Sequence, residues 1–148
     1  MRVVIQRVDN ASVNINNSYT ESINKGYMIL LGICNGDTNE DIDYLVNKIS
    51  KLRIFEDENE KMNFNINDIN GEILLISQFT LYANTKDGNR PSFTDSMKFD
   101  EANSMYEEFK NRLRETNIPF KTGEFGANMK VSLINDGPVT IIIDSKDR

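Results

Sequence analysis

Short apolar runs separated by turn-forming residues occupy much of the chain and predict strands. Apolar and β-branched residues gather in runs at positions 1–8, 11–15, 25–33, 72–79 and 128–144. The runs at 25–33 and 72–79 are almost continuously apolar, which is typical of strands that are buried on both faces. Asp9 and Asn10 separate the first two runs, so we expect a turn between them.

The last run contains a cluster of turn-forming residues. Asn135-Asp136-Gly137-Pro138 interrupts the apolar residues between positions 128 and 144. Glycine is free of the steric limits on other residues, whereas proline fixes φ and donates no N–H. The pattern predicts a hairpin-like unit of two strands. The same cluster could instead present main-chain atoms to a ligand, and the pattern alone leaves both interpretations open.

Two segments carry apolar residues at the spacing of an amphipathic helix. Thr38 is a suitable N-cap for the first segment, and Asp100 is suitable for the second. The apolar positions are Ile42, Leu45, Val46, Ile49 and Leu52 in the first segment, and Ala102, Met105, Tyr106, Phe109 and Leu113 in the second.

The remaining segments complete the expected fold. The polar, asparagine-rich residues 56–70 predict a mobile loop with one apolar anchor, Met62 or Phe64, and residues 120–122 predict a short strand. Sequential strands combined with two main helices indicate a single α/β domain over residues 1–148. Its sheet is expected to be mixed or largely antiparallel, and barrel-like.

Composition narrows the possible chemistry. The chain has no histidine, which excludes histidine-activated nucleophiles and removes the commonest zinc ligand. Its single cysteine, Cys34, cannot form an intramolecular disulfide. The net charge of −6 argues against an extensive nucleic-acid interface but allows a site that grips only a nucleotide terminus. Without a long apolar run, we expect a cytoplasmic protein with no membrane segment.

Two stretches could form a site. Ser77, Gln78, Phe79 and Thr80 come at the end of a predicted buried strand, where polar side chains often line a site. Composition alone favours the simpler interpretation, a strand edge with satisfied polar groups. Residues 123–129 (GEFGANM) hold glycines, an aromatic ring and a thioether that can sandwich a flat base, but they lack the lysine of a phosphate-binding loop.

Two other features have simpler explanations. Cys34 follows an apolar strand and has no histidine to activate it, so we expect a small buried hydrophobe. Four carboxylates could suggest a metal site, but their spacing fits the first turn of a helix better. They are Asp37, Glu40, Asp41 and Asp43.

Several segments together resemble the D-aminoacyl-tRNA deacylase family. They are SQFTL at 77–81, NDGPVT at 135–140, MRVVIQRV at 1–8 with ASV at 11–13, GNRPSF at 88–93 and GEFGANM at 123–129. The resemblance covers the whole chain. It implies a homodimeric α/β fold built around a barrel-like sheet, with the active site at the dimer interface. It also implies hydrolysis of the ester that joins a D-amino acid, or glycine, to the terminal adenosine of tRNA.

The resemblance also assigns roles to residues. Gly137 and Pro138 match a Gly-cisPro motif that enters the partner subunit's pocket, and Arg7 matches the residue that holds this motif. Ser77, Gln78 and Phe79 match the segment around the scissile ester, and Phe125 and Met129 match residues that pack on the adenine. Thr80 matches a residue once proposed as the nucleophile; the later view of the family uses the 2′-hydroxyl of the adenosine.

The residues fit this chemistry without a cofactor or a metal. The backbone N–H groups of Phe79 and Thr80 are candidates for an oxyanion hole. The carbonyl groups of Gly137 and Pro138 could fill the space that an L-side chain needs. Basic residues that could meet the tRNA acceptor end are Lys86, Arg90, Lys98 and Lys130. Two alternatives stay open: a paralogous deacylase that clears L-alanyl-tRNA, and a non-catalytic dimeric interaction module.

Overall fold

One long strand, β1 (Arg2–Ile15), organises the sheet of this computed structural model, which describes residues 1–148. On one edge, β1 pairs antiparallel with β3 (Gly26–Gly32) through its first half and with β2 (Tyr19–Ile23) through its second half. On the other edge it pairs antiparallel with β8 (Met129–Asp144).

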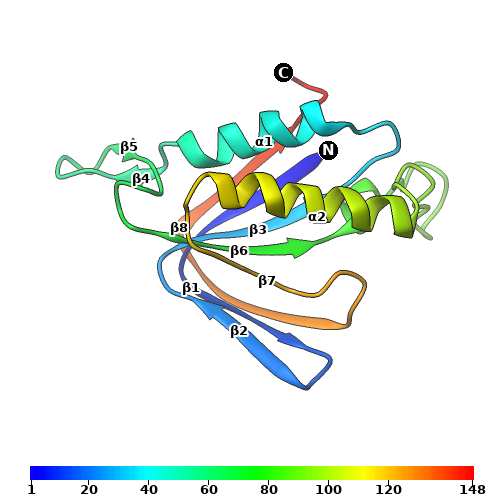
Figure 1. Ribbon diagram of the computed structural model, residues 1–148, viewed down its shortest axis with the longest axis horizontal. Coiled ribbons are helices and arrows are strands. Elements are labelled where there is room, and N and C mark those ends of the chain that lie inside the picture. The colour runs from blue at the N-terminus through cyan, green and yellow to red at the C-terminus, as the bar shows by residue number, and fades with distance from the viewer.

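Two parallel strands extend the sheet beyond β3, and the whole sheet curls. They are β6 (Glu72–Ser77), which pairs with β3, and β7 (Phe120–Thr122), which pairs with β6. Figure 1 shows β2 and the first part of β8 curving round below β6 and β7. The predicted mixed, largely antiparallel and barrel-like sheet is confirmed.

β1 is a single strand, so the predicted turn at Asp9-Asn10 is wrong. Val8 pairs with Asn135 and Asn10 pairs with Ile134, which leaves Asp9 without a partner as a bulge. Alternation along β1 still decides what is buried. Val3 and Ile5 enter the larger core. Ala11, Val13 and Ile15 enter a second, smaller core inside the curled part of the sheet.

β8 is also a single strand, so the predicted hairpin-like unit is wrong. Gln6 pairs with Thr140 and Val8 with Asn135, so residues 136–139 of β8 face only Arg7 of β1. The ladder continues on both sides of this point. Residues 136–139 therefore protrude from a continuous strand, and we call them the β8 bulge.

Two helices, α1 (Asn39–Lys51) and α2 (Phe99–Glu115), lie side by side across one face of the sheet (Figure 1). The predicted helices are confirmed, and their buried residues are Ile42, Leu45, Val46 and Ile49 in α1 and Ala102, Tyr106, Phe109 and Leu113 in α2. Asp41 accepts a hydrogen bond from the N–H of the N-cap Thr38 at 2.8 Å. Lys98, not Asp100, precedes α2 as its N-cap.

Two local expectations need correction. Residues 56–70 contain a small hairpin rather than only a loop, with β4 (Phe55–Glu56) paired to β5 (Met62–Phe64). Of the two expected anchors, Phe64 packs against the larger core and Met62 is exposed; Ile66, which was not expected, is fully buried. β6 ends at Ser77, and a short 3-10 helix, η1 (Phe79–Tyr82), follows. None of the helices has the length and apolar character that crossing a bilayer requires.

Candidate active site

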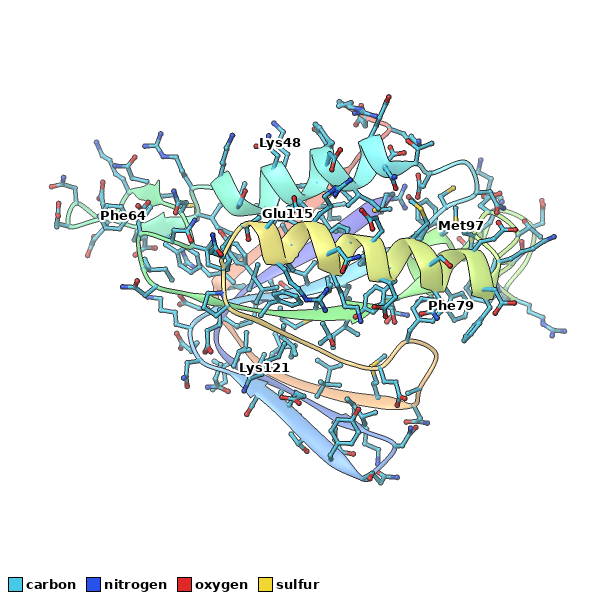
Figure 2. All side chains as sticks on the ribbon, viewed as in Figure 1. Lys48, Phe64, Phe79, Met97, Glu115 and Lys121 are labelled. Carbon is cyan, nitrogen blue, oxygen red and sulfur yellow. The ribbon has the colours of Figure 1, made fainter.

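A largely apolar cleft of about 670 Å³ opens where β6 ends. Its walls come from Ser77–Phe79, from the start of α2 at Phe99 and Ala102, and from residues 125–131. In Figure 2 the labelled Phe79 and Met97 lie at the same end of α2. The curl of the sheet is what brings the first residues of β8 to the end of β6.

The segment Ser77 to Thr80 turns away from the sheet at the mouth of the cleft. Ser77 is the last residue of β6, and the N–H of Gln78 still donates to the carbonyl of Leu31 at 2.8 Å. η1 then begins, so the N–H groups of Phe79 and Thr80 have no partner within that helix. Free N–H groups beside an apolar cleft are suited to bind a carbonyl oxygen or an oxyanion.

The side chains of this segment have different positions. Ser77, Gln78 and Phe79 line the cleft, whereas Thr80 is exposed and does not. The Phe79 side chain is 57% exposed, and its ring meets the ring of Phe93 edge-on at 5.0 Å. Gln78 Nε2 donates to Thr80 Oγ1, so the hydroxyl of Thr80 is engaged as an acceptor.

Aromatic residues form another wall of the same cleft. Phe125 and Met129 both line the cleft. The ring of Phe125 lies edge-on to Phe99 at 5.1 Å and packs on the buried Tyr106 at 5.5 Å. Phe99 is 61% exposed, so a large aromatic face is open to a ligand. Sequence reasoning missed Phe99 because it lies one residue before the expected helix and outside its apolar stripe.

The β8 bulge lies apart from the cleft of the same chain. Gly137 and Pro138 are exposed, the peptide bond between them is cis, and neither residue lines the cleft. Arg7 is buried beneath them. Its Nε lies 3.2 Å from both the carbonyl oxygen and a carboxylate oxygen of Asp136, and its Nη1 donates to the carbonyl of Ile54 at 2.7 Å.

Gln6 holds the two ends of the β8 bulge together. Its side-chain oxygen accepts hydrogen bonds from Asn135 Nδ2 at 2.9 Å and from Thr140 Oγ1 at 2.5 Å. Sequence reasoning gave Gln6 no role. Its position opposite Thr140 depends on the pairing of β1 with β8, which no local pattern reveals.

Charged and titratable groups near the cleft are few. Lys98 lines it, whereas Lys86 and Arg90 lie exposed in the preceding loop, and Lys130 Nζ donates to Asn17 Oδ1 at 3.2 Å.

Burial raises the pKa of the Cys34 thiol, and the charge of Asp37 raises it further. These effects keep the thiol neutral, although Cys34 is half-buried rather than buried as expected.

The acidic residues near α1 have structural partners. Asp37 accepts from the Met1 amino group at 2.5 Å, and Asp41 pairs with Lys146 Nζ at 2.8 Å. No group of three or more histidine, cysteine or acidic residues is placed to hold a metal ion.

The chain is similar to known proteins over nearly its whole length. The family model described as D-Tyr-tRNA(Tyr) deacylase matches residues 4–144. A D-aminoacyl-tRNA deacylase of Finegoldia magna is 55% identical over 146 residues, which cover 99% of each chain. The enzyme of the same name from Bacillus pumilus is 53% identical over 147 residues, 99% of this chain and 100% of the other.

Solved structures share the fold. One titled "c-Myc DNA Unwinding Element Binding Protein" is 40% identical, with a TM-score of 0.90 over 97% of this chain and 98% of the other. A structure described as a probable eukaryotic D-amino acid tRNA deacylase is 18% identical with a TM-score of 0.84, which shows the shared fold. By its match over residues 4–144 and by its relatives, this chain belongs to the D-Tyr-tRNA(Tyr) deacylase family.

Proposed function

We propose that this protein hydrolyses the ester that joins a D-amino acid to the 3′-terminal adenosine of tRNA. The relatives named D-aminoacyl-tRNA deacylase, at 55% and 53% identity over nearly the full chain, support the reaction class. The observation that carries the proposal is the cleft itself. Phe79, Phe99 and Phe125 line it, and at Phe79 the chain enters η1, whose first N–H groups, those of Phe79 and Thr80, have no partner within the helix.

The cleft accommodates the two ends of the substrate in different places. The adenine stacks among Phe125, Met129 and Phe99, because aromatic and thioether groups suit the flat face of a base. The ester carbonyl then lies near Phe79 and Thr80, whose N–H groups bind the oxyanion of the tetrahedral intermediate.

The chemistry needs little more than positioning. An aminoacyl ester is already reactive, and the chain has no histidine to act as a general base. The adenosine 2′-hydroxyl lies next to the ester and organises the attacking water. Thr80 Oγ1 takes no covalent part, because it lies outside the cleft and accepts a hydrogen bond from Gln78.

The β8 bulge selects by chirality. The main-chain carbonyls of Gly137 and Pro138 occupy the space that the side chain of an L-amino acid would enter, while a D-side chain points away. Arg7 and Gln6 hold these carbonyls in a fixed place. Glycine has no side chain to meet these carbonyls and is not excluded. Glycine that is wrongly attached to tRNA(Ala) is therefore also hydrolysed.

A homodimer completes the site. Gly137 and Pro138 do not line the cleft of their own chain, so a second copy must supply them. β8 pairs only with β1, and its other edge is free. On this strand the exposed Ile134 and Ile142 flank the β8 bulge. Apolar side chains beside a free strand edge favour burial against a second copy of the chain.

Incubation of the protein with D-Tyr-tRNA and L-Tyr-tRNA tests the proposal. We expect catalytic release of D-tyrosine and at least about 100-fold slower release of L-tyrosine, because an exclusion of this kind costs several kcal/mol. Release of L-alanine from L-Ala-tRNA in preference to both would favour the paralogous deacylase. No release from any ester would favour a non-catalytic interaction module.

A further inference from the structure

A second, polar notch of about 360 Å³ lies at the other end of α2. Its lining residues are Glu21, Lys110, Arg114, Phe120, Lys121 and Thr122. Three are cationic and one is anionic, which gives the lining a charge of +2 in a chain whose net charge is −6. A local excess of positive charge on an acidic protein is a candidate site for a polyanion.

Two of the three cations are available to a ligand. The guanidinium of Arg114 donates to the neutral side-chain oxygen of Asn111 at 2.6 Å, and no carboxylate lies within 4.0 Å of it. The ammonium of Lys121 is 3.9 Å from Glu21, with both side chains well exposed. An exposed pair at that distance contributes little and exchanges readily for a phosphate. Lys110, by contrast, is tightly paired with Glu107 at 2.6 Å.

The notch and the cleft are joined by a seam of contacts between α2 and residues 120–125. Arg114 stacks over the ring of Phe120, with 5.8 Å from its guanidinium carbon to the ring centroid. Further along, the rings of Tyr106 and Phe99 pack against Phe125, with centroids 5.5 and 5.1 Å away.

The length of the seam fits the end of an RNA strand. The eight residues from Ala102 in the cleft to Lys110 in the notch rise about 12 Å along the helix. The four residues from Lys121 to Phe125 span at most about 14 Å. Phosphates of a stacked strand are about 3.4 Å apart along the helix axis, so about four nucleotides cover the seam.

We propose that the notch formed by Arg114 and Lys121 binds the phosphate backbone of the tRNA acceptor strand, about four nucleotides before the terminal adenosine held in the cleft. This inference rests on the proposed function for the location of the adenosine. It explains how an acidic protein binds a polyanion: the contact is confined to a small notch whose lining carries a charge of +2.

Matched double variants test the notch. Arg114→Gln/Lys121→Gln removes its two available charges. Lys48→Gln/Lys51→Gln removes two charges from the last turn of α1, where Lys48 lies on the outer side in Figure 2. Binding of tRNA that carries no amino acid and hydrolysis of D-Tyr-tRNA are measured between 50 and 200 mM salt. Over this range the affinity depends strongly on the number of phosphate contacts. Hydrolysis of 3′-O-D-tyrosyl-adenosine, which cannot reach the notch, is measured alongside.

We expect the notch variant to bind uncharged tRNA about tenfold more weakly at low salt, with a salt slope shallower by about 1.4, or 0.7 for each contact with a single strand. The KM of the notch variant for D-Tyr-tRNA should rise by a similar factor, while its rate on the adenosine ester should equal that of wild type. The α1 control variant should match wild type in tRNA affinity, salt slope and KM. If the salt slope of tRNA binding were unchanged, or if the notch variant lost as much activity on the adenosine ester as on D-Tyr-tRNA, the notch would not be a phosphate site. If wild-type protein hydrolyses neither ester but the notch variant still binds tRNA more weakly, the proposed reaction fails and the notch stands.

Discussion

The side-chain oxygen of Gln6 accepts a hydrogen bond from the hydroxyl of Thr140 at 2.5 Å. The same oxygen accepts from Asn135 at 2.9 Å, so it connects the two ends of the β8 bulge. The next residue, Arg7, holds the bulge from the opposite face of the sheet, because successive side chains of a strand point to opposite faces. Two adjacent residues of β1 therefore fix the position of Gly137 and Pro138.

Replacement of Gln6 should loosen the β8 bulge. In Gln6→Leu both hydrogen bonds are lost, which we expect to lower the free energy of unfolding by about 1–3 kcal/mol. The ratio of D-Tyr-tRNA to L-Tyr-tRNA hydrolysis should fall, because the excluding carbonyls are no longer held in one place. Gln6→Glu keeps the accepting oxygen and serves as the control. If Gln6→Leu discriminated as well as wild type, the role of Gln6 would be structural only.

Gly137 should tolerate no side chain. Its φ is +122°, and a Cβ would lie 2.7 Å from Val139 Cγ2 and 3.1 Å from Arg7 Nη2. In Gly137→Ala, either Val139 or Arg7 must move, and we expect the ratio of D-ester to L-ester hydrolysis to fall by about tenfold or more.

Gly36→Ala is the control that separates the steric clash of a Cβ from the strain of a positive φ. Gly36 has a φ of +82°, but a Cβ there meets nothing within 4 Å. The control should therefore lower stability by about 1–2 kcal/mol without changing selectivity. Equal D-to-L ratios in wild type and Gly137→Ala would contradict the proposed filter.

Local patterns predicted the helices well and the strand ends poorly. Both helices carry their apolar residues at a spacing that no other element accommodates, and both occur where expected. Asp9-Asn10 and Gly137-Pro138 are turn-forming residues, yet they lie within β1 and β8. A bulge absorbs such residues when a long partner strand continues the ladder on both sides, and that partner is distant in sequence.

The site could be predicted only in part for a similar reason. Ser77, Gln78 and Phe79 were distinguished by their place at a strand end. Phe125 and Met129 were distinguished as an aromatic ring and a thioether in a glycine-bearing loop, and the structure places all five around one cleft. Phe99 and Gln6 were missed because their roles depend on contacts between elements far apart in the chain.

The proposed dimer should be disrupted by a charge at the free edge of β8. The side chain of Ile142 is 65% exposed in the single chain, and Ile142→Asp would bury a charge in the proposed interface. We expect a monomer by sedimentation and about a 100-fold or greater loss of D-Tyr-tRNA hydrolysis, since in the proposed dimer each site needs the partner's bulge.

Met62→Asp is the matched control for this change. Met62 is similarly exposed, at 51%, but lies on β5, away from the β8 edge. The control should stay dimeric and active. An Ile142→Asp monomer with full, stereoselective activity would remove the need for a second subunit.

The role of Thr80 separates two mechanisms. Thr80→Ala should keep activity within about tenfold of wild type, because only its backbone N–H binds the oxyanion. A tRNA ending in 2′-deoxyadenosine should react about 10²–10⁴-fold more slowly, which is the typical contribution of a positioned proton-transfer group. Single-turnover rates with both substrates measure the two effects. Complete loss of activity in a folded Thr80→Ala would instead indicate a side-chain nucleophile.

Asp41 should make stability depend on acidic pH. Burial raises the pKa of its carboxyl group, but hydrogen bonds from Lys146 and from the N–H of Thr38 outweigh burial and hold the pKa well below its usual value. The unfolded chain therefore binds the proton more readily than the folded chain. The contribution of Asp41 is complete above the unfolded pKa of about 4 and is lost as the pH falls below it.

Thermal unfolding of Asp41→Asn from pH 7 to pH 3 tests this dependence. The variant should have a lower Tm than wild type at pH 7, and the difference should shrink below about pH 4, where Asp41 takes up a proton in the unfolded wild-type chain while it stays ionised in the folded one. The lowered pKa of Asp144 also affects stability in acid, but it acts on both proteins and cancels in the difference. Asp87→Asn, at an exposed loop position, should match wild type throughout. A difference in Tm that stayed constant down to pH 3 would show that Asp41 stabilises the fold by its shape and hydrogen bonds rather than by its charge.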